Sequence, residues 1–119
     1  MANLFRCGNG SKSHFVYRFM AIGNQSPSKA KLYVPDGAKT IKIGSASVNS
    51  SGVTGFIIIE GTTKDGVSTE IRNTRLTFSP GINDIVEDIS NYSSVTITLA
   101  VNSSGANHIA YAEDIEMVF

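Results

Sequence analysis

The stretch SVTITLAV, residues 94–101, alternates apolar side chains with threonine or alanine, and this alternation decides the fold class. Every second position is apolar: Val95, Ile97, Leu99 and Val101. Because successive side chains of a β-strand point to opposite faces, a period of two residues places all four on one face. The stretch therefore predicts a strand with one buried face.

Three further runs extend the β pattern. Residues 39–44 repeat the alternation, with Ile41 and Ile43 between polar residues. Residues 55–61 (GFIIIEG) and 14–22 (HFVYRFMAI) are apolar on both faces. This pattern is typical of central strands that are covered above and below, so we expect both runs inside a sheet or under a neighbouring copy.

Turn-forming triplets separate these runs: PDG at residues 35–37, KDG at 64–66 and SPG at 79–81. The triplets begin 29 and 15 residues apart, and turn signals that separate short strand-like runs in this way are typical of β-sandwiches and barrels. No segment shows a sustained helical period. The sequence therefore predicts an all-β, single-domain antiparallel β-sandwich over residues 13–119, preceded by a flexible N-terminal arm of residues 1–12.

Composition excludes several classes of partner. Ten Lys and Arg balance ten Asp and Glu, and no basic block supplies the electrostatic footprint that nucleic acid or anionic lipid requires. The opening MANLFRCGNG lacks the apolar core of a signal peptide or membrane helix, so we expect synthesis in a cytoplasm and no membrane partner. The single cysteine, Cys7, has no intrachain disulfide partner.

The two histidines are the starting point for any catalytic or zinc site. Cys7 and His14 would form only half of a zinc site, because no second ligand pair exists. His108 could be approached by Asp114 or Glu116, but no sequence motif exposes a serine beside it. We therefore predict no catalytic residue, no cofactor and no metal ligand, and we expect no hydroxyl bonded to His108 within a cleft.

The acidic residues near the C-terminus have an ordinary explanation. Asp114 and Glu116 alternate with apolar residues, which indicates the solvated face of a strand rather than a catalytic carboxylate pair. A structural calcium held by Glu113, Asp114 and loop carbonyls stays open as an alternative, although no run of oxygen ligands is present.

Most of the chain carries phrases of a known architecture. VPDGAKTIKI (residues 34–43) precedes a central apolar strand, FSPGINDIVEDISNYSSVTITLAV (78–101) follows, and IAYAEDIEMVF (109–119) closes the chain. This order resembles the galactose-binding-like jelly-roll sandwiches, over residues 31–119. The resemblance implies a jelly-roll architecture, and because such domains include many carbohydrate-binding modules, it makes recognition of cell-surface glycans the alternative function.

A glycan site usually stacks an aromatic ring on a sugar. Tyr17 and Tyr111 are in phase with apolar neighbours, so we expect them in the core. The candidate glycan contacts are Tyr33, Tyr92, Asn102, Asn107 and His108. Against this alternative, the loop between the last two strands is rich in Asn, Ser and Gly and lacks an aromatic residue, so we expect it only to turn the chain.

The first fifteen residues, MANLFRCGNGSKSHF, resemble the start of small virion-associated proteins encoded by phages and prophages of Gram-positive bacteria. The resemblance implies a non-enzymatic tail, baseplate or capsid-decorating module, assembled into a virion in the host bacterial cytoplasm. Its partners would be other copies of itself and other virion proteins. Leu4, Phe5 and Arg6 are the expected assembly contacts, because an arm can order against a neighbouring subunit.

Overall fold

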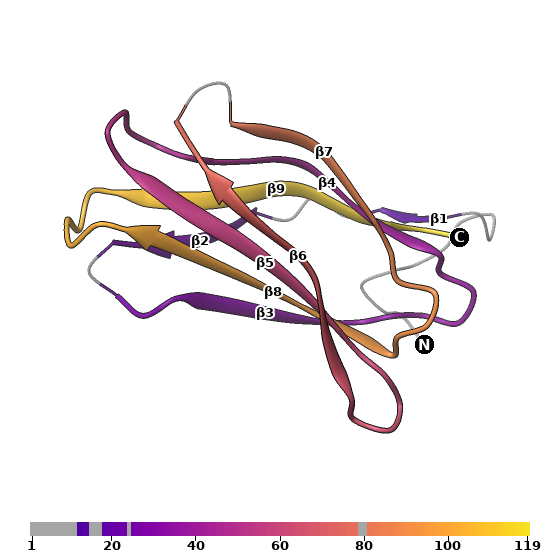
Figure 1. Ribbon diagram of the computed structural model, residues 1–119. Coiled ribbons are helices and arrows are strands. Elements are labelled where there is room, and N and C mark those ends of the chain that lie inside the picture. Colours follow the sequence, from indigo (N-terminus) through magenta and orange to yellow (C-terminus); the bar gives the residue numbers. More distant parts are fainter. Residues whose placement is uncertain (1–11, 15–17, 24, 79–80) are drawn as a thin grey trace.

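The alternating stretch forms β8 (Ser94–Asn102), an inner strand of a four-stranded antiparallel sheet that we call sheet B (Figure 1). Its strand order is β3 (Ser28–Tyr33), β8, β5 (Thr54–Thr62) and β6 (Ser68–Leu76). The apolar side chains of β8 face inward and are fully buried, as predicted: Val95, Ile97 and Leu99.

The second sheet, sheet A, lies against the inner face of sheet B. Its order is β1 (Lys12–His14), β9 (Ile109–Val118), β4 (Thr40–Val48) and β7 (Ile82–Asp88), all antiparallel. Strand β2 (Arg18–Ile22) also pairs with β9, beyond the end of β1. Sheet A therefore has a two-part edge on one side and β7 on the other.

The computed structural model describes residues 12–14, 18–23, 25–78 and 81–119. These residues contain no helix, so none that could cross a membrane, and β1 begins one residue before the predicted domain boundary. From β2 onward the chain changes sheet at every connection except the β5–β6 hairpin, which gives the interleaved order of a double-sheet jelly roll. The predicted single-domain antiparallel β-sandwich is confirmed.

The core lies between the two sheets and consists mainly of isoleucine. Strands β4, β5, β8 and β9 supply side chains with no exposed surface: Ile41, Ile43, Ile57, Ile59, Ile97, Leu99, Ile115 and Met117. The inward side chains of these four strands pack between the two facing sheets, because each strand alternates inward and outward residues. Among the described side chains, every buried nitrogen and oxygen atom has a hydrogen-bond partner.

The two runs that are apolar on both faces have different positions. Residues 55–61 lie in β5, an inner strand as predicted, although Phe56 on its outer side is 37% exposed. The expectation of a central strand at residues 14–22 is wrong: β2 is the edge strand of sheet A at this end, and residues 15–17 lie outside the described part. Apolarity on both faces therefore did not identify a central strand, and burial of residues 14–22 under a neighbouring copy stays a prediction.

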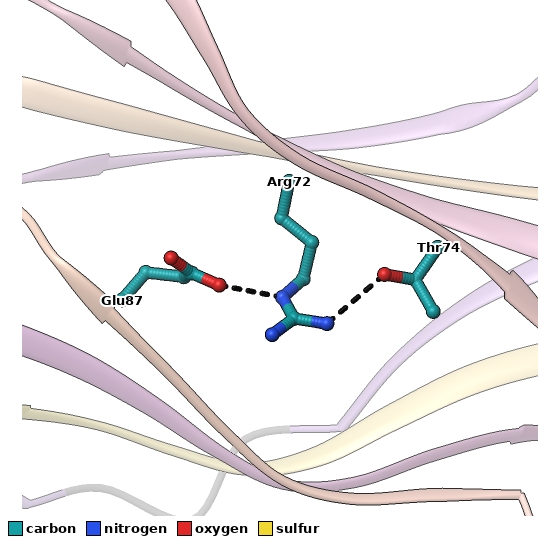
Figure 2. A network of polar contacts seen from close by, with 3 residues as sticks. All are labelled: Arg72, Thr74 and Glu87. Atoms are coloured by element: carbon teal, nitrogen blue, oxygen red, sulfur yellow. Dashed lines mark hydrogen bonds and ion pairs between the residues drawn. The ribbon is translucent and has the colours of Figure 1, made fainter.

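An ion pair joins the two sheets where β6 and β7 form their edges (Figure 2). Arg72 and Glu87 both point inward, because their register partners Ile59 and Ile41 are buried. The Arg72 Nε donates to Glu87 Oε2 at 2.6 Å, and an Arg72 terminal nitrogen donates to the hydroxyl of Thr74 at 3.0 Å. The Arg72–Glu87 ion pair connects the two sheets along one long side of the sandwich, and both side chains are largely shielded from water.

Candidate functional site

The loops that could form a site lie at two opposite ends of the sandwich (Figure 1). Tyr33 and Tyr92 lie at the end that holds the β3–β4, β5–β6 and β7–β8 turns. Asn102, Asn107 and His108 lie at the other end, beyond the nine residues of β8. Nine residues of strand span roughly 30 Å. The structure therefore does not bring the five candidate glycan contacts together.

The first end contains a pocket of about 400 Å³, lined by residues 34–38, 63–65 and 90–93. Ser93 connects the three turns that form it. Its carbonyl accepts the N–H of Val34 at 3.0 Å, and its own N–H and hydroxyl donate to the carbonyl of Thr62 at 2.8 and 3.1 Å. The pocket is therefore held in shape by the backbone of neighbouring strands.

Tyr92 forms part of the pocket wall but is committed to packing. A Cβ atom on Gly61 would lie 2.5 Å from Cγ of the Tyr92 ring and 2.6 Å from both Cδ atoms, so the ring lies flat over this glycine. One face of the ring is therefore occupied by the chain itself. Tyr33 is different, because it is 77% exposed at the end of an edge strand.

Some polar groups of the pocket are hydrogen-bonded to other residues of the chain, and others are not. The N–H and hydroxyl of Ser90 donate to Asp88 Oδ1 at 2.9 and 2.7 Å, and these bonds lower the pKa of the Asp88 carboxyl. No hydrogen bond within the described part of the chain involves the side chains of Asp36, Lys64, Asp65 or Asn91, all of which are exposed. These four are the groups with which the pocket could contact a polar ligand.

His108, at the other end, is hydrogen-bonded to a hydroxyl. The hydroxyl of Ser103 lies 2.6 Å from His108 Nδ1 and accepts the N–H of Gly105 at 3.0 Å. The His108 N–H in turn donates to the Gly105 carbonyl at 3.1 Å. Asp114 lies on β9, five residues beyond Ile109, or roughly 17 Å along the strand. The Ser103–His108 pair therefore stabilises a turn, and neither acidic residue considered in the sequence orients it.

Asn49 completes the same turn. Its Nδ2 donates to the carbonyl of Asn107, and its Oδ1 accepts the N–H of Ile109, both at 2.9 Å. The loop between β8 and β9 thus uses its polar residues to satisfy backbone groups, as we expected of a segment that turns the chain. The role of Asn49 was missed in the sequence, because nothing in residues 103–109 indicates a partner sixty positions earlier.

A shallow groove of about 340 Å³ crosses the outer side of sheet A around Gly44. Asp84 and Asp114, on the two neighbouring strands, adopt left-handed φ values of 56° and 57°. A Cβ on Gly44 would lie 2.8 Å from Cβ of Asp114, so the glycine makes room for that side chain. Asp114 is thus exposed as predicted but does not lie on a regular strand.

No group of three or more His, Cys, Asp or Glu side chains in the described residues is arranged to hold a metal ion. The calcium alternative named Glu113 and Asp114, which are neighbours on β9. The described side chains do not add a third carboxylate ligand to these two.

An apolar patch lies on the outer face of sheet A, near the end that holds His108. We define the outer patch as Met20, Ile22, Ile109 and Tyr111. Met20 is opposite Tyr111 in the β2–β9 register and Ile22 is opposite Ile109, so the four side chains adjoin. Met20 is 45% and Ile22 38% exposed, and the other two are half-buried.

The place of Tyr111 in this patch corrects the expectation that it belongs to the core. Its neighbours Ala110 and Ala112 are the residues that face inward, and both have no exposed surface. In the run IAYA every residue is apolar or aromatic, so the sequence alone does not show which half of the alternation is buried.

The remaining predicted residues fall outside the described part of the chain. The assembly contacts Leu4, Phe5 and Arg6 precede Lys12, the first described residue. Tyr17 lies in the gap between β1 and β2. Contact between the arm and a neighbouring subunit stays a prediction.

Comparisons with known proteins give a single class of finding. No protein-family model and no curated protein matches the chain. Among solved structures, the chain is similar to one from the structure of infectious bursal disease virus, Gt strain, with 13% sequence identity and a TM-score of 0.34. The match covers 90% of this chain and 33% of the viral one, so this chain spans about a third of that chain's length.

Proposed function

We propose that this chain is a non-enzymatic structural module of a virion, which works by associating with copies of itself and with other virion proteins. The observation that carries the proposal is the outer patch. The sandwich already has a filled core, yet four adjoining apolar residues lie on an outer face of sheet A. Contiguous exposed apolar patches on a folded domain are typical of protein–protein contact surfaces and ligand-binding grooves.

The architecture is compatible with this role. Double-sheet jelly rolls are widespread in viral capsid and lectin domains, where the sandwich is a rigid block and its outer surfaces make the contacts. Net charge supports association as well, because ten basic and ten acidic residues leave little repulsion between copies.

The finer assignment rests on the opening residues of the chain. Their resemblance to small virion-associated proteins of phages from Gram-positive bacteria supports a tail, baseplate or capsid-decorating module. Assembly would then take place in the host bacterial cytoplasm. A galactose-binding-like origin of the jelly roll is a separate proposal, supported by the phrases around residues 34–43 and 78–101.

Replacing Met20 and Ile22 together with serine should convert an oligomer of the purified protein into a monomer. The two side chains supply the most exposed apolar surface of the outer patch, and each serine removes most of the roughly 1.5–3 kcal/mol available from burying such a residue. Size-exclusion chromatography with light scattering measures the result.

Val86→Ser is the matched control. Val86 is 46% exposed on the outer side of the same sheet, but it lies opposite Lys42 and outside the outer patch. This variant should keep the oligomer. A wild-type protein that stays monomeric at high concentration would refute self-association.

Carbohydrate binding is the second candidate, and the end pocket is the observation that favours it. The pocket combines Tyr92 and Asn91 with an exposed Tyr33 close by, and it has a size typical of small-ligand sites. On a glycan array, the wild type should retain a defined sugar, and Asn91→Ala or Tyr33→Ala should weaken retention at least about tenfold, a loss of roughly 1.4 kcal/mol. Tyr92 is unsuitable for this test, because its ring supports the fold. An array without selective retention ends this candidate.

A further inference from the structure

We propose that β2 of one copy pairs antiparallel with β2 of a second copy, so that sheet A continues across both molecules and Met20 faces Met20 at a two-fold axis. This inference rests on the proposed self-association and names the contact through which it occurs. Three features of β2 support it: the direction of its backbone groups, the side chains that it presents, and the charges at the other sheet edges.

Part of the β2 backbone faces away from β9. The N–H of Gly23 donates to the carbonyl of His108 at 2.9 Å, and the register of β2 and β9, continued by one residue, places these two residues opposite each other. Hydrogen-bonded and non-hydrogen-bonded pairs alternate along an antiparallel ladder, so residues 21 and 19 also bond to β9. The N–H and C=O groups of residues 18, 20 and 22 therefore point toward the open side of the strand.

Two further hydrogen bonds agree with this direction. The N–H of Asn49 donates to the carbonyl of Ile109 at 2.9 Å, so the backbone of Ile109 points toward β4 and not toward its opposite residue Ile22. The carbonyl of Ile22 accepts the N–H of Gln25 at 3.0 Å, within the turn that follows β2. The N–H of Ile22 and both backbone groups of Met20 face a side on which no described strand is paired with β2.

The exposed side chains at this edge are apolar, which distinguishes β2 from other edges. Met20 is 45% and Ile22 38% exposed on the outer side, while Phe19 and Ala21 are buried on the inner side. Exposed charges on an edge strand discourage the addition of another strand. The edge strands β3, β6 and β7 each present two such side chains: Lys29 and Lys31, Glu70 and Arg75, Asp84 and Asp88. Among the edge strands with described side chains, β2 is therefore the one suited to accept a further strand.

A second copy of β2 fits this edge because the strand is complementary to itself. In an antiparallel pairing centred on Met20, each Met20 N–H donates to the Met20 carbonyl of the other copy, and each Ile22 N–H donates to the carbonyl of the residue 18 opposite it. Arg18 is then opposite Ile22 in register, whereas an in-register parallel pairing would align the two arginines. The outer patches of the two copies, to which Met20 and Ile22 belong, become continuous.

Amide hydrogen exchange of the full chain tests the pairing, followed by nuclear magnetic resonance at one concentration where light scattering shows monomer and one where it shows oligomer. The Met20 amide should exchange at least about tenfold more slowly in the oligomer, because it gains a hydrogen bond. Lys31 is the matched control. Its strand β3 is also an edge, and the N–H of Val34 donates to the carbonyl of the opposite Ser93 at 3.0 Å, so by the same alternation the Lys31 amide points away from the sheet. The Lys31 amide should exchange rapidly at both concentrations.

Proline substitution tests the same hydrogen bond through affinity. Met20→Pro removes an N–H that does not bond to β9, and it should raise the dissociation constant of the dimer at least about tenfold. Lys31→Pro makes the same change at the edge of sheet B and should leave association unchanged. Circular dichroism of both variants establishes that they are folded.

A charge exchange at position 20 tests the two-fold axis and does not depend on the proline variants. Met20→Lys and Met20→Glu should each be monomeric, because two equal charges would face each other across the axis. An equal mixture of the two should form a heterodimer, identified by native mass spectrometry. Met20→Lys mixed with Val86→Glu should form no mixed dimer, since position 86 lies on β7, away from the contact.

Two results would overturn the strand pairing and leave self-association intact. One is an oligomer whose Met20 amide exchanges as fast as in the monomer. The other is a mixture of Met20→Lys and Met20→Glu that stays monomeric although the wild type dimerises. Wild-type affinity in a folded Met20→Pro variant would also overturn the pairing. A wild-type protein that is monomeric at every concentration would refute the pairing and the proposed function together.

Discussion

Ile97→Ala should lower the free energy of unfolding by about 3–4 kcal/mol, near the middle of the range for large-to-small substitutions in cores. Ile97 has no exposed surface and lies in β8 between Ala30 on β3 and Ile59 on β5. Both neighbouring strands are hydrogen-bonded to β8 along their lengths, so the backbone cannot collapse into the space that the lost side chain leaves. The cavity therefore adds to the lost transfer free energy.

Chemical denaturation followed by fluorescence or circular dichroism measures this loss, with the slope against denaturant checked for two-state behaviour. Thr96→Ala, on the outer side of the same strand, should change stability by less than about 1 kcal/mol. A cost below about 1 kcal/mol for Ile97→Ala would show that the two sheets are not packed as described.

Gly61→Ala should destabilise the fold by about 2–3 kcal/mol, because the new methyl group would overlap the ring of Tyr92. The overlap involves Cγ and both Cδ atoms, which lie near the backbone and cannot move aside by a small rotation of the side chain. The ring would have to leave its place against the core, and the pocket wall would move with it.

A double-mutant cycle isolates this contact. In a Tyr92→Ala background, the additional cost of Gly61→Ala should fall below about 1 kcal/mol, since the methyl group then enters vacant space. Equal costs in both backgrounds would mean that the alanine is opposed by the strand backbone and not by the ring. Measuring unfolding free energies of all four proteins under the same conditions completes the cycle.

The sequence predicted those parts of the fold that depend on local periodicity. Alternation in residues 94–101 and 39–44 identified β8 and β4, and the KDG triplet identified the β5–β6 hairpin. Alternation reports which side of a strand is buried. Neither alternation nor apolarity on both faces reports which strand lies beside another, and this is why residues 14–22 were expected in the interior of a sheet and not at its edge.

The candidate glycan contacts also show that the sequence does not reveal which residues lie close together in space. Tyr92 and Asn102 are ten residues apart, but β8 is extended between them and places them at opposite ends of the sandwich. The sequence therefore named residue types suited to a glycan site without showing which of them meet. Conversely, Met20 and Tyr111 are adjacent across a strand pair that only the complete topology reveals, although apolarity on both faces of residues 14–22 was the signal available for the outer patch.

The position of β9 has a consequence for how the protein is made. This strand follows all the others in the chain, yet it lies inside sheet A, between β4 on one side and β1 and β2 on the other. Before β9 is made, β4 and β7 can pair with each other, but β1 and β2 cannot be joined to them, and Ile41 and Ile43 lack their neighbours on one side. Sheet A therefore cannot be completed before its last strand has been made, and pairing between strands so far apart in the chain makes folding slow for a domain of this size.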